Sequence, residues 1–143
     1  MKILCASSIV ALVLSVCVSA APIHSAEENQ TSLLKRGISY KGTATWYKPA
    51  SEGGSQGACN GVHIDNSSYY VALNHAQYGN MNANSSWCGK KIKITGPAGS
   101  VTAKIMDACP GCGKNDLDLT PALFLKVVGS MTKGVGSITW QLA

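Results

Sequence analysis

Glycine and aromatic residues are confined to one part of this chain, and that distribution limits where a fold can form. All fifteen glycines and all nine aromatic residues lie at or beyond Gly37. Aromatic side chains supply much of the apolar area that a core buries, and glycines permit tight turns. We therefore expect the folded part to occupy residues 37–143, a length typical of a single domain.

The preceding residues have the pattern of targeting and processing segments. A basic start, an apolar run to Val18 and a small-residue exit indicate a secretory signal peptide over residues 1–20. A membrane anchor is the alternative, but the apolar run is at the short limit for a span. Residues 21–36 are polar and end in Lys35-Arg36, which indicates a pro-segment cut at a dibasic site; an uncut tail is the alternative. We expect a secreted, extracellular product.

The charge of the expected domain argues against several classes of partner. Residues 37–143 keep nine lysines and five acidic residues and contain no arginine. Arginine is the residue best suited to paired hydrogen bonds with phosphate, and nucleic-acid binders usually gather basic residues on one face. We expect a monomer with no nucleic-acid or membrane partner and no cofactor. The run Lys90, Lys91 and Lys93 is interpreted as a charged edge strand that resists aggregation, with contact to acidic wall polymers as the alternative.

Four cysteines remain in the expected domain: Cys59, Cys88, Cys109 and Cys112. An even number in a small secreted domain is typical of two disulfides. The C-x-x-C spacing of the last two also occurs in zinc sites and redox motifs. A zinc site of this kind usually has a second pair, and a redox motif lies in a βαβ unit; the sequence shows neither. We expect two disulfides and no metal, and the residues alone leave the pairing open.

Short alternating segments predict a β protein with little helix. Five or six strands are expected, of which five are placed by period-two alternation or short apolar runs, at 40–47, 69–73, 91–95, 101–106 and 136–142. A helix is indicated at 120–128, where Thr120 can cap, Pro121 fits the first position and Gly129 ends the apolar pattern. Because strands and helices do not alternate, the fold class expected is all-β, in a small closed barrel.

Three segments together resemble a known family: residues 42–47 (GTATWY), residues 88–94 (CGKKIKI), and the block Asp107-Ala108-Cys109-Pro110-Gly111-Cys112 with residues 117–121 (LDLTP). Their order and spacing resemble the double-psi β-barrel of the rare-lipoprotein-A-like, expansin-like and barwin-like proteins, and most of all the short fungal secreted members of loosenin type. The resemblance implies six barrel strands. The barwin-like pattern also implies a Cys59–Cys88 disulfide, which leaves Cys109–Cys112, a tight loop in which strain is a concern.

The resemblance also implies a polysaccharide site. Expansins hold a threonine of the first strand and two aspartates eleven positions apart, and Thr45, Asp107 and Asp118 match them, with Asp118 at the acid position. We expect Asp107 to end a strand and Asp118 to precede the helix, so that both lie at one barrel rim. Two such carboxylates, partly desolvated, separate their pKa values and leave one group protonated. The alternative is structural: Asp118 caps the helix and Asp107 holds backbone N–H groups of the Cys-Pro-Gly-Cys turn.

Hydrolysis is not expected. An inverting glycosidase needs a second carboxylate as base, which related endoglucanases place in the first strand; here the first acid after Gly37 is Glu52, in a loop. If there is catalysis, a one-acid reaction like that of lytic transglycosylases, or a glycosidase-like reaction, is expected. Trp46, Tyr47 and Trp87 are candidates for contact with sugar rings. Asn66 and Asn84 begin N-glycosylation sequons.

The function expected is therefore binding, and loosening without hydrolysis, of a cell-wall polysaccharide such as cellulose, chitin or a peptidoglycan-like polymer. A secreted protease inhibitor or effector is the alternative, because barrels of this kind include inhibitors of cysteine proteases. A flavin-modifying enzyme follows only from the names of relatives, and the sequence contains no glycine-rich dinucleotide motif to support it.

Overall fold

The computed structural model describes residues 37–52 and 55–143. In chain order the elements are β1 (Ser39–Trp46), β2 (Tyr70–Asn74), α2 (His75–Tyr78), β3 (Lys91–Gly96), β4 (Gly99–Cys109), β5 (Leu117–Leu119), α3 (Pro121–Val128), a 3₁₀ turn η1 (Met131–Lys133) and β6 (Gly136–Leu142). The predicted signal peptide and pro-segment lie outside the described residues. No helix among the described residues is long and apolar enough to cross a membrane.

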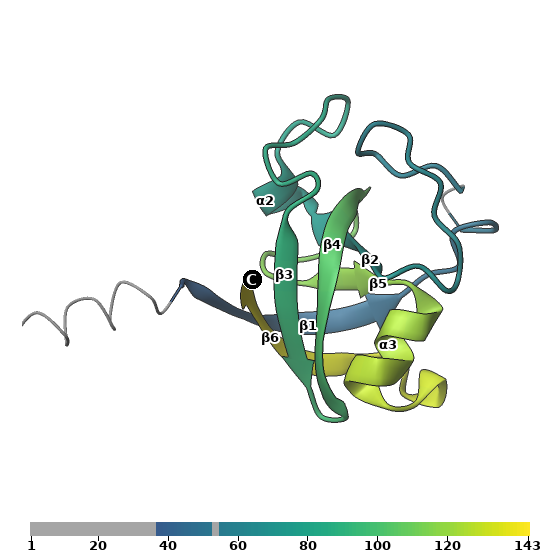
Figure 1. Cartoon of the computed structure of the whole chain (residues 1–143), viewed down its shortest axis with the longest axis vertical. Helices are drawn as coiled ribbons and strands as arrows, with labels where there is room; N and C mark the ends of the chain where they lie inside the picture. Colours follow the sequence, from purple (N-terminus) through teal and green to yellow (C-terminus); the bar gives the residue numbers. More distant parts are fainter. Residues whose placement is uncertain (1–36, 53–54) are drawn as a thin grey trace, which may run out of the picture. The chain divides into compact units, whose positions relative to one another are not determined.

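The strands close into a barrel in the order β1-β5-β2-β4-β3-β6, with β6 paired back to β1 (Figure 1). The pairs β1–β5 and β2–β4 are parallel, and the other four pairs are antiparallel. The two long connections on either side of β2 gather at one end of the barrel (Figure 1). This closed, mixed, six-stranded architecture confirms the predicted all-β class and the double-psi barrel.

The core is built from the inward positions of the alternating strands. Ile92 and Ile94 are fully buried, as their period-two pattern predicts, while the alternating Lys91 and Lys93 are exposed. Trp140 of β6 is 1% exposed and stacks on Tyr40 of β1, with ring centroids 4.3 Å apart. Helix α3 covers one side of the core with a fully buried Phe124. Each fully buried large apolar side chain contributes about 1.5–3 kcal/mol, so the barrel interior supplies most of the stability.

β5 is the strand that the sequence patterns did not place. It is only three residues long, Leu117–Leu119, which is too short to show a period, and it is nevertheless the strand on which β1 and β2 both pair. Helix α3 lies where it was predicted and Thr120 occupies its N-cap position, but the Thr120 side chain makes no capping hydrogen bond. The Thr120 side chain is buried; its hydroxyl donates to the Ser68 carbonyl, and its oxygen accepts no N–H of the first helical turn.

β3 is not an edge strand, so that interpretation of its lysines was wrong. Lys91 faces Lys104 of β4, and Lys93 faces Thr102 of β4 on one side and Gln141 of β6 on the other. A closed barrel leaves no open edge to protect. The lysines therefore lie on the outer face of a strand that is paired on both sides.

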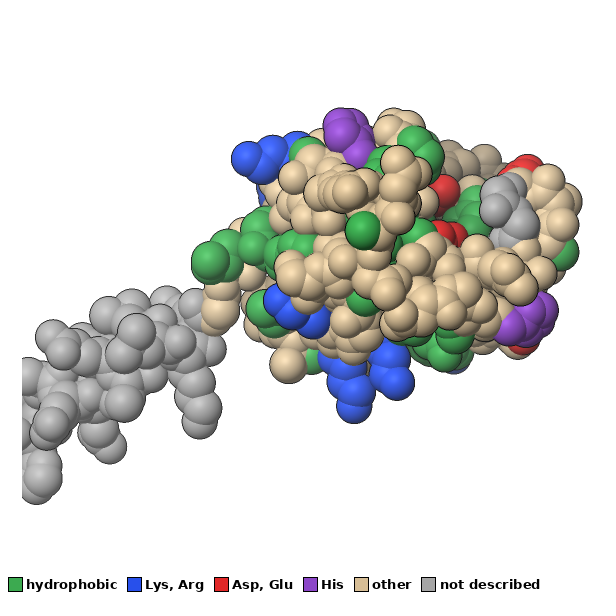
Figure 2. All heavy atoms as spheres, turned by 90° about the horizontal axis from the view of Figure 1, so that it is seen from above, with side chains coloured by type: hydrophobic (Ala, Val, Ile, Leu, Met, Phe, Trp, Pro, Cys, Tyr) green, Lys and Arg blue, Asp and Glu red, His purple; other side chains and the backbone are tan. Residues whose placement is uncertain are grey.

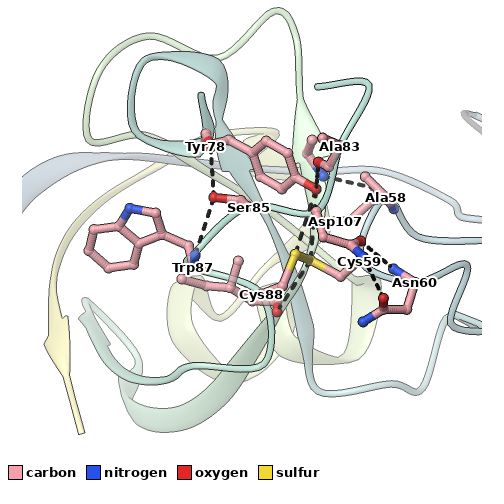
Figure 3. Close-up of a disulfide and its surroundings, with 12 residues drawn as sticks. Ala58, Cys59, Asn60, Tyr78, Ala83, Ser85, Trp87, Cys88 and Asp107 are labelled. Atoms are coloured by element: carbon pink, nitrogen blue, oxygen red, sulfur yellow. Dashed lines mark hydrogen bonds between the residues drawn. A yellow bond between two sulfur atoms is a disulfide. The ribbon is translucent and has the colours of Figure 1, made fainter. Parts of the chain in front are cut away.

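Both disulfides are formed. Cys59 bonds to Cys88, with Cα atoms 5.5 Å apart, and joins the two long loops on either side of β2 (Figure 3). Cys109 bonds to Cys112 across a short turn, with Cα atoms 5.4 Å apart, which is within the usual range for a disulfide. The pairing implied by the barwin-like resemblance is therefore the one found, and the short loop accommodates its bridge.

Candidate functional site

Three of the predicted site residues, Thr45, Asp107 and Asp118, lie in one row across the outside of the barrel. In register, Ala72 of β2 faces Asp107 of β4 on one side and Asp118 of β5 on the other, and Asp118 in turn faces Thr45 of β1. Side chains directly opposite one another on neighbouring strands point to the same face. The row therefore runs Asp107, Ala72, Asp118, Thr45, and the two aspartates are two strand spacings apart, roughly 10 Å at the backbone.

A bulge in β4 places Asp107 in this row. The β2–β4 register passes from Val71 opposite Ile105 directly to Ala72 opposite Asp107, so Met106 is the extra residue. Without the shift, Asp107 would share the inward parity of the fully buried Ile105. Asp107 thus lies within β4 on the outer face, and not at its end as predicted, while Asp118 is the middle residue of β5. The aspartates share a barrel face, where a shared rim had been expected.

Asp118 is held by Thr45. The Thr45 hydroxyl donates to Asp118 Oδ1 at 2.7 Å, and both side chains are half-buried. Burial raises the pKa of the Asp118 carboxyl above its ordinary value. The Thr45 hydrogen bond partly offsets that rise, and the negative charges of Glu52 and Asp107 add to it. Asp118 therefore keeps its proton to a higher pH than an ordinary aspartate does.

Asp107 is held by three donors. Its Oδ1 accepts the backbone N–H groups of Ala58 and Ala108, each at 2.9 Å, and its Oδ2 accepts the Tyr47 hydroxyl at 3.0 Å. Figure 3 shows the carboxylate beside the loop that carries Ala58 and Cys59. The alternative role predicted for Asp107, a partner for backbone N–H groups, is thus partly realised. One of those groups belongs to the loop before Cys59.

Tyr47 spans the row. Its backbone N–H donates to the Leu119 carbonyl, next to Asp118, while its hydroxyl reaches Asp107 two strands further on. The ring must therefore lie over β5 and β2, where Ala72 is 2% exposed and offers only a methyl group. Burial, followed by the charge of Asp107 and its hydrogen bond, raises the pKa of the Tyr47 hydroxyl above its ordinary value, so the hydroxyl is a donor at all ordinary pH.

Glu52 is a third carboxylate near the row. The turn after Tyr47 holds it, because Glu52 Oε2 accepts the Lys48 backbone N–H at 2.9 Å and the Glu52 N–H donates to the Lys48 carbonyl at 2.8 Å. Its charge raises the pKa of Asp118 more than the charge of Asp107 does. The sequence identified this residue only as a loop acid, because its approach to Asp118 depends on how the turn folds. Figure 2 shows acidic side chains recessed beside hydrophobic ones on this side of the barrel.

This arrangement can do acid chemistry on a bound hydroxyl or glycosidic oxygen. Asp118 is the group that can give a proton, because its pKa is raised and only one of its oxygens accepts a side-chain donor. Both oxygens of Asp107 already accept hydrogen bonds, so neither is left unengaged to position a water. Within the described residues, no group of three or more metal-ligating side chains is assembled.

The aromatic candidates do not gather at the row. Trp46 points to the other face of β1, where its ring lies 6.4 Å from Phe124. Trp87 packs edge-on against Tyr40 and Trp140, at 6.2 and 5.9 Å, and its ring points away from Asp107 in Figure 3. Tyr47 is at the row, but it is 8% exposed and offers little ring surface.

The two sequon asparagines are both exposed and lie in loops. Asn66 lies in the turn before β2, where its carbonyl accepts the Ala122 N–H at 3.0 Å. Asn84 lies near the Cys59–Cys88 disulfide, where its side chain exchanges two hydrogen bonds with Asn60, at 2.9 and 2.5 Å.

No family model matches the sequence. An Asp f 7 allergen homolog from Arthroderma benhamiae is 37% identical over 76 residues, covering 52% of this chain and 26% of that protein. A putative ripening-related protein of rice, Oryza sativa subsp. japonica, is 26% identical over 110 residues, covering 66% of this chain and 38% of that protein. The chain thus spans well under half the length of these relatives.

Solved structures with the same barrel include proteins with different functions. A Streptomyces papain inhibitor matches with a TM-score of 0.61 and 29% identity, covering 73% of this chain and 94% of that one. An expansin from Clavibacter michiganensis matches with a TM-score of 0.60 and 26% identity, covering 74% of this chain and 50% of that one. The fungal elicitor cerato-platanin shares the fold at 18% identity and a TM-score of 0.50, covering 71% of this chain and 91% of that one. The predicted resemblance to expansin-like and barwin-like double-psi barrels is confirmed.

Proposed function

We propose that this protein is a secreted barrel that binds a cell-wall polysaccharide on the outer face of β4, β2, β5 and β1 and loosens it without hydrolysis. The observation that supports this most is the row in which Thr45 holds Asp118, because it presents one carboxyl of raised pKa beside a fixed, hydrogen-bonded Asp107. A variant of the Clavibacter expansin has been crystallised with cellohexaose, and that barrel is 25% identical to this one.

We expect no hydrolysis because, among the described residues, no carboxylate near Asp118 is placed as an unengaged base. An inverting mechanism needs an unengaged base across the sugar from the acid, holding a water. Asp107 is engaged by three donors, and Glu52 is exposed and also accepts the Lys48 N–H. We therefore assign Asp118 the role of a proton donor or hydrogen-bond donor to a sugar oxygen, without a partner that activates water.

Two measurements on the purified protein test this proposal. Cosedimentation with insoluble cellulose, chitin and peptidoglycan should show binding to at least one of them, and a reducing-sugar assay should show no release from the same polymer. The breaking force of cellulose paper, or the extension of heat-inactivated wall strips, reports loosening. We expect Asp118→Asn to abolish loosening and Asp65→Asn, the same change in an exposed loop, to leave it intact.

Three results would overturn the proposal. If none of the three polymers is bound, the row does not serve polysaccharide. If the protein releases sugar vigorously, it is a hydrolase, and loss of that release in Glu52→Gln would identify the base that the proposal denies. If the protein releases anhydro-sugar products from peptidoglycan without an increase in reducing ends, it catalyses the one-acid transglycosylase reaction instead.

Protease inhibition is the second candidate, and the Streptomyces papain inhibitor supports it, because the shared barrel makes up 94% of that protein. An inhibitor of this shape would act through its loops and not through the aspartate row. Inhibition of a papain-class protease that is unchanged in Asp118→Asn would favour this candidate. Loss of wall loosening in the same variant, with no inhibition by the parent protein, would favour the polysaccharide.

A further inference from the structure

The other half of the barrel surface carries a basic, hydroxyl-rich face. Its outward positions form two rows across β4, β3, β6 and β1, Thr102–Lys93–Gln141–Ser39 and Ser100–Thr95–Thr139–Lys41, and a shorter row in which Lys91 faces Lys104. All ten side chains are exposed. We call these ten residues the lysine face. Four of them are lysine, five carry hydroxyl groups, and none is acidic or apolar.

The lysine face is not explained by the needs of the fold. β3 is paired on both sides, so its lysines do not protect an open edge. Lys91 and Lys104 are directly opposite each other, an arrangement that destabilises a sheet. No acidic residue in the three rows offsets this repulsion. The barrel thus tolerates a local accumulation of positive charge that a negatively charged partner would relieve.

Two hollows mark this face. One, of about 110 Å³, is lined by Ser39, Lys93, Thr95, Thr139, Trp140 and Gln141. The other, of about 290 Å³, lies beside the Lys91–Lys104 pair and is lined also by Tyr69, whose side chain is 41% exposed, and by Tyr70. Lys91 and Lys104 therefore border the larger hollow, which the accessible Tyr69 ring also lines, and Lys93 borders the smaller hollow. An extended chain crossing β3 would meet both recesses and the ammonium groups between them.

We propose that the lysine face binds a polysaccharide that carries carboxylate groups, at a site separate from the aspartate row. Successive outward lysines on a strand are roughly 6.7 Å apart, and facing lysines are about 5 Å apart at Cβ, so the cations are spaced for a polymer with a charge on each sugar ring. The surrounding hydroxyl and amide groups suit the neutral oxygens of such a polymer.

The chemistry of the face favours this partner over other polyanions. Residues 37–143 contain no arginine, the residue that grips phosphate with paired hydrogen bonds. The ten residues of the lysine face include no apolar side chain that could enter a bilayer, and the single exposed ring beside them in the described structure, Tyr69, does not form the series of rings on which successive bases stack. A carboxylated glycan needs neither of these features.

The test measures binding of polygalacturonate to the purified protein, with methyl-esterified polygalacturonate as the uncharged control polymer. The double variant Lys91→Gln with Lys104→Gln removes two charges from the face. Its matched control, Lys126→Gln with Lys133→Gln, removes two charges from α3 and η1, where both lysines are exposed. We expect affinity to fall on the order of tenfold in the first variant and less than twofold in the second, and to weaken as salt is raised.

Several outcomes would overturn this inference: no binding of polygalacturonate, equal binding of the esterified polymer, equal losses in the two double variants, or equally tight binding of duplex DNA or of vesicles rich in phosphatidylserine. The inference fails independently of the proposed function. Asp118→Asn should keep polygalacturonate binding, and the Lys91/Lys104 variant should keep binding to a neutral wall polymer.

Discussion

Replacing Tyr47 with phenylalanine isolates the hydrogen bond that ties the first strand to Asp107. The phenylalanine ring fits the same buried space over β5 and β2, so the change removes the hydroxyl and little else. That hydroxyl donates to Asp107 Oδ2 at 3.0 Å, while the other carboxylate oxygen keeps its two backbone donors, Ala58 and Ala108. The variant should therefore fold to the same barrel with a lower free energy of unfolding.

The expected loss is about 1.5 kcal/mol at neutral pH. A hydrogen bond to a charged group contributes about 1.5–3 kcal/mol, and the low end applies because Asp107 is half-buried, keeps two donors and can be hydrated in the variant. The raised pKa of Tyr47 adds a second signature. Above about pH 10 the unfolded chain releases a tyrosine proton that the folded chain retains, so this contribution to stability falls as pH rises. The phenylalanine variant lacks that part of the alkaline loss.

Urea unfolding followed by tryptophan fluorescence, with disulfides intact, measures both effects. Tyr69→Phe, an exposed tyrosine, is the control and should change stability by less than about 0.5 kcal/mol. A double-mutant cycle with Asp107→Asn should give a coupling energy of about 1 kcal/mol. Additive effects within about 0.4 kcal/mol, or an unfolding free energy equal to the parent's, would refute the claim that Tyr47 acts through Asp107.

Three further predictions concern stability. Because the folded state raises the pKa of Asp118, the favourable contribution of its protonated form is present at low pH and lost as pH rises through the folded-state pKa. Asp118→Asn should therefore stabilise the protein at neutral pH and flatten its pH–stability curve in urea titrations. Gly42→Ala places a Cβ 2.3 Å from the Asn115 carbonyl oxygen and should cost about 3 kcal/mol or prevent expression, whereas Gly37→Ala, with open space around it, should be neutral by thermal melting. Removing the Cys59–Cys88 bridge, which spans 29 residues, should cost about 3.5 kcal/mol, against about 2 kcal/mol for the bridge that spans 3; equal losses would contradict the loop-entropy account.

The sequence predicted those parts of the barrel whose pattern is local. The isoleucines of β3 and the Pro121 start of α3 carry period and capping signals within a few residues, and both elements lie where they were expected. β5 was not predicted, because three residues are too few to show a period and its pairing depends on strands distant in the chain. Thr120 occupies the N-cap position, but its side chain makes no capping hydrogen bond; its hydroxyl is bonded to the Ser68 carbonyl, a contact 52 residues away that no local pattern encodes.

The same division holds at the candidate site. The resemblance pointed to Thr45 and Asp118, and the structure brings them together in the β1–β5 register. The roles of Tyr47 and Ala72 depend on the bulge at Met106 and on the path of a ring across two strands, which no local pattern encodes. Tyr47 was predicted to contact sugar rings; its burial and its hydrogen bond to Asp107 give it a structural role that the sequence did not reveal.

The aspartate row can form only after the barrel has closed during folding. Within residues 37–52 and 55–143, the strands that pair with β1 are β5 and β6, and Thr45 and Asp118 are 73 residues apart in the chain. Folds dominated by such distant pairings form slowly, because the entropy of loop closure is lost before the stabilising contacts form. While the chain is being synthesised, β1 has no strand to pair with until β5 has emerged. The aspartate row is consequently a property of the finished molecule alone, and the Thr45–Asp118 hydrogen bond can serve as a spectroscopic reporter of barrel closure.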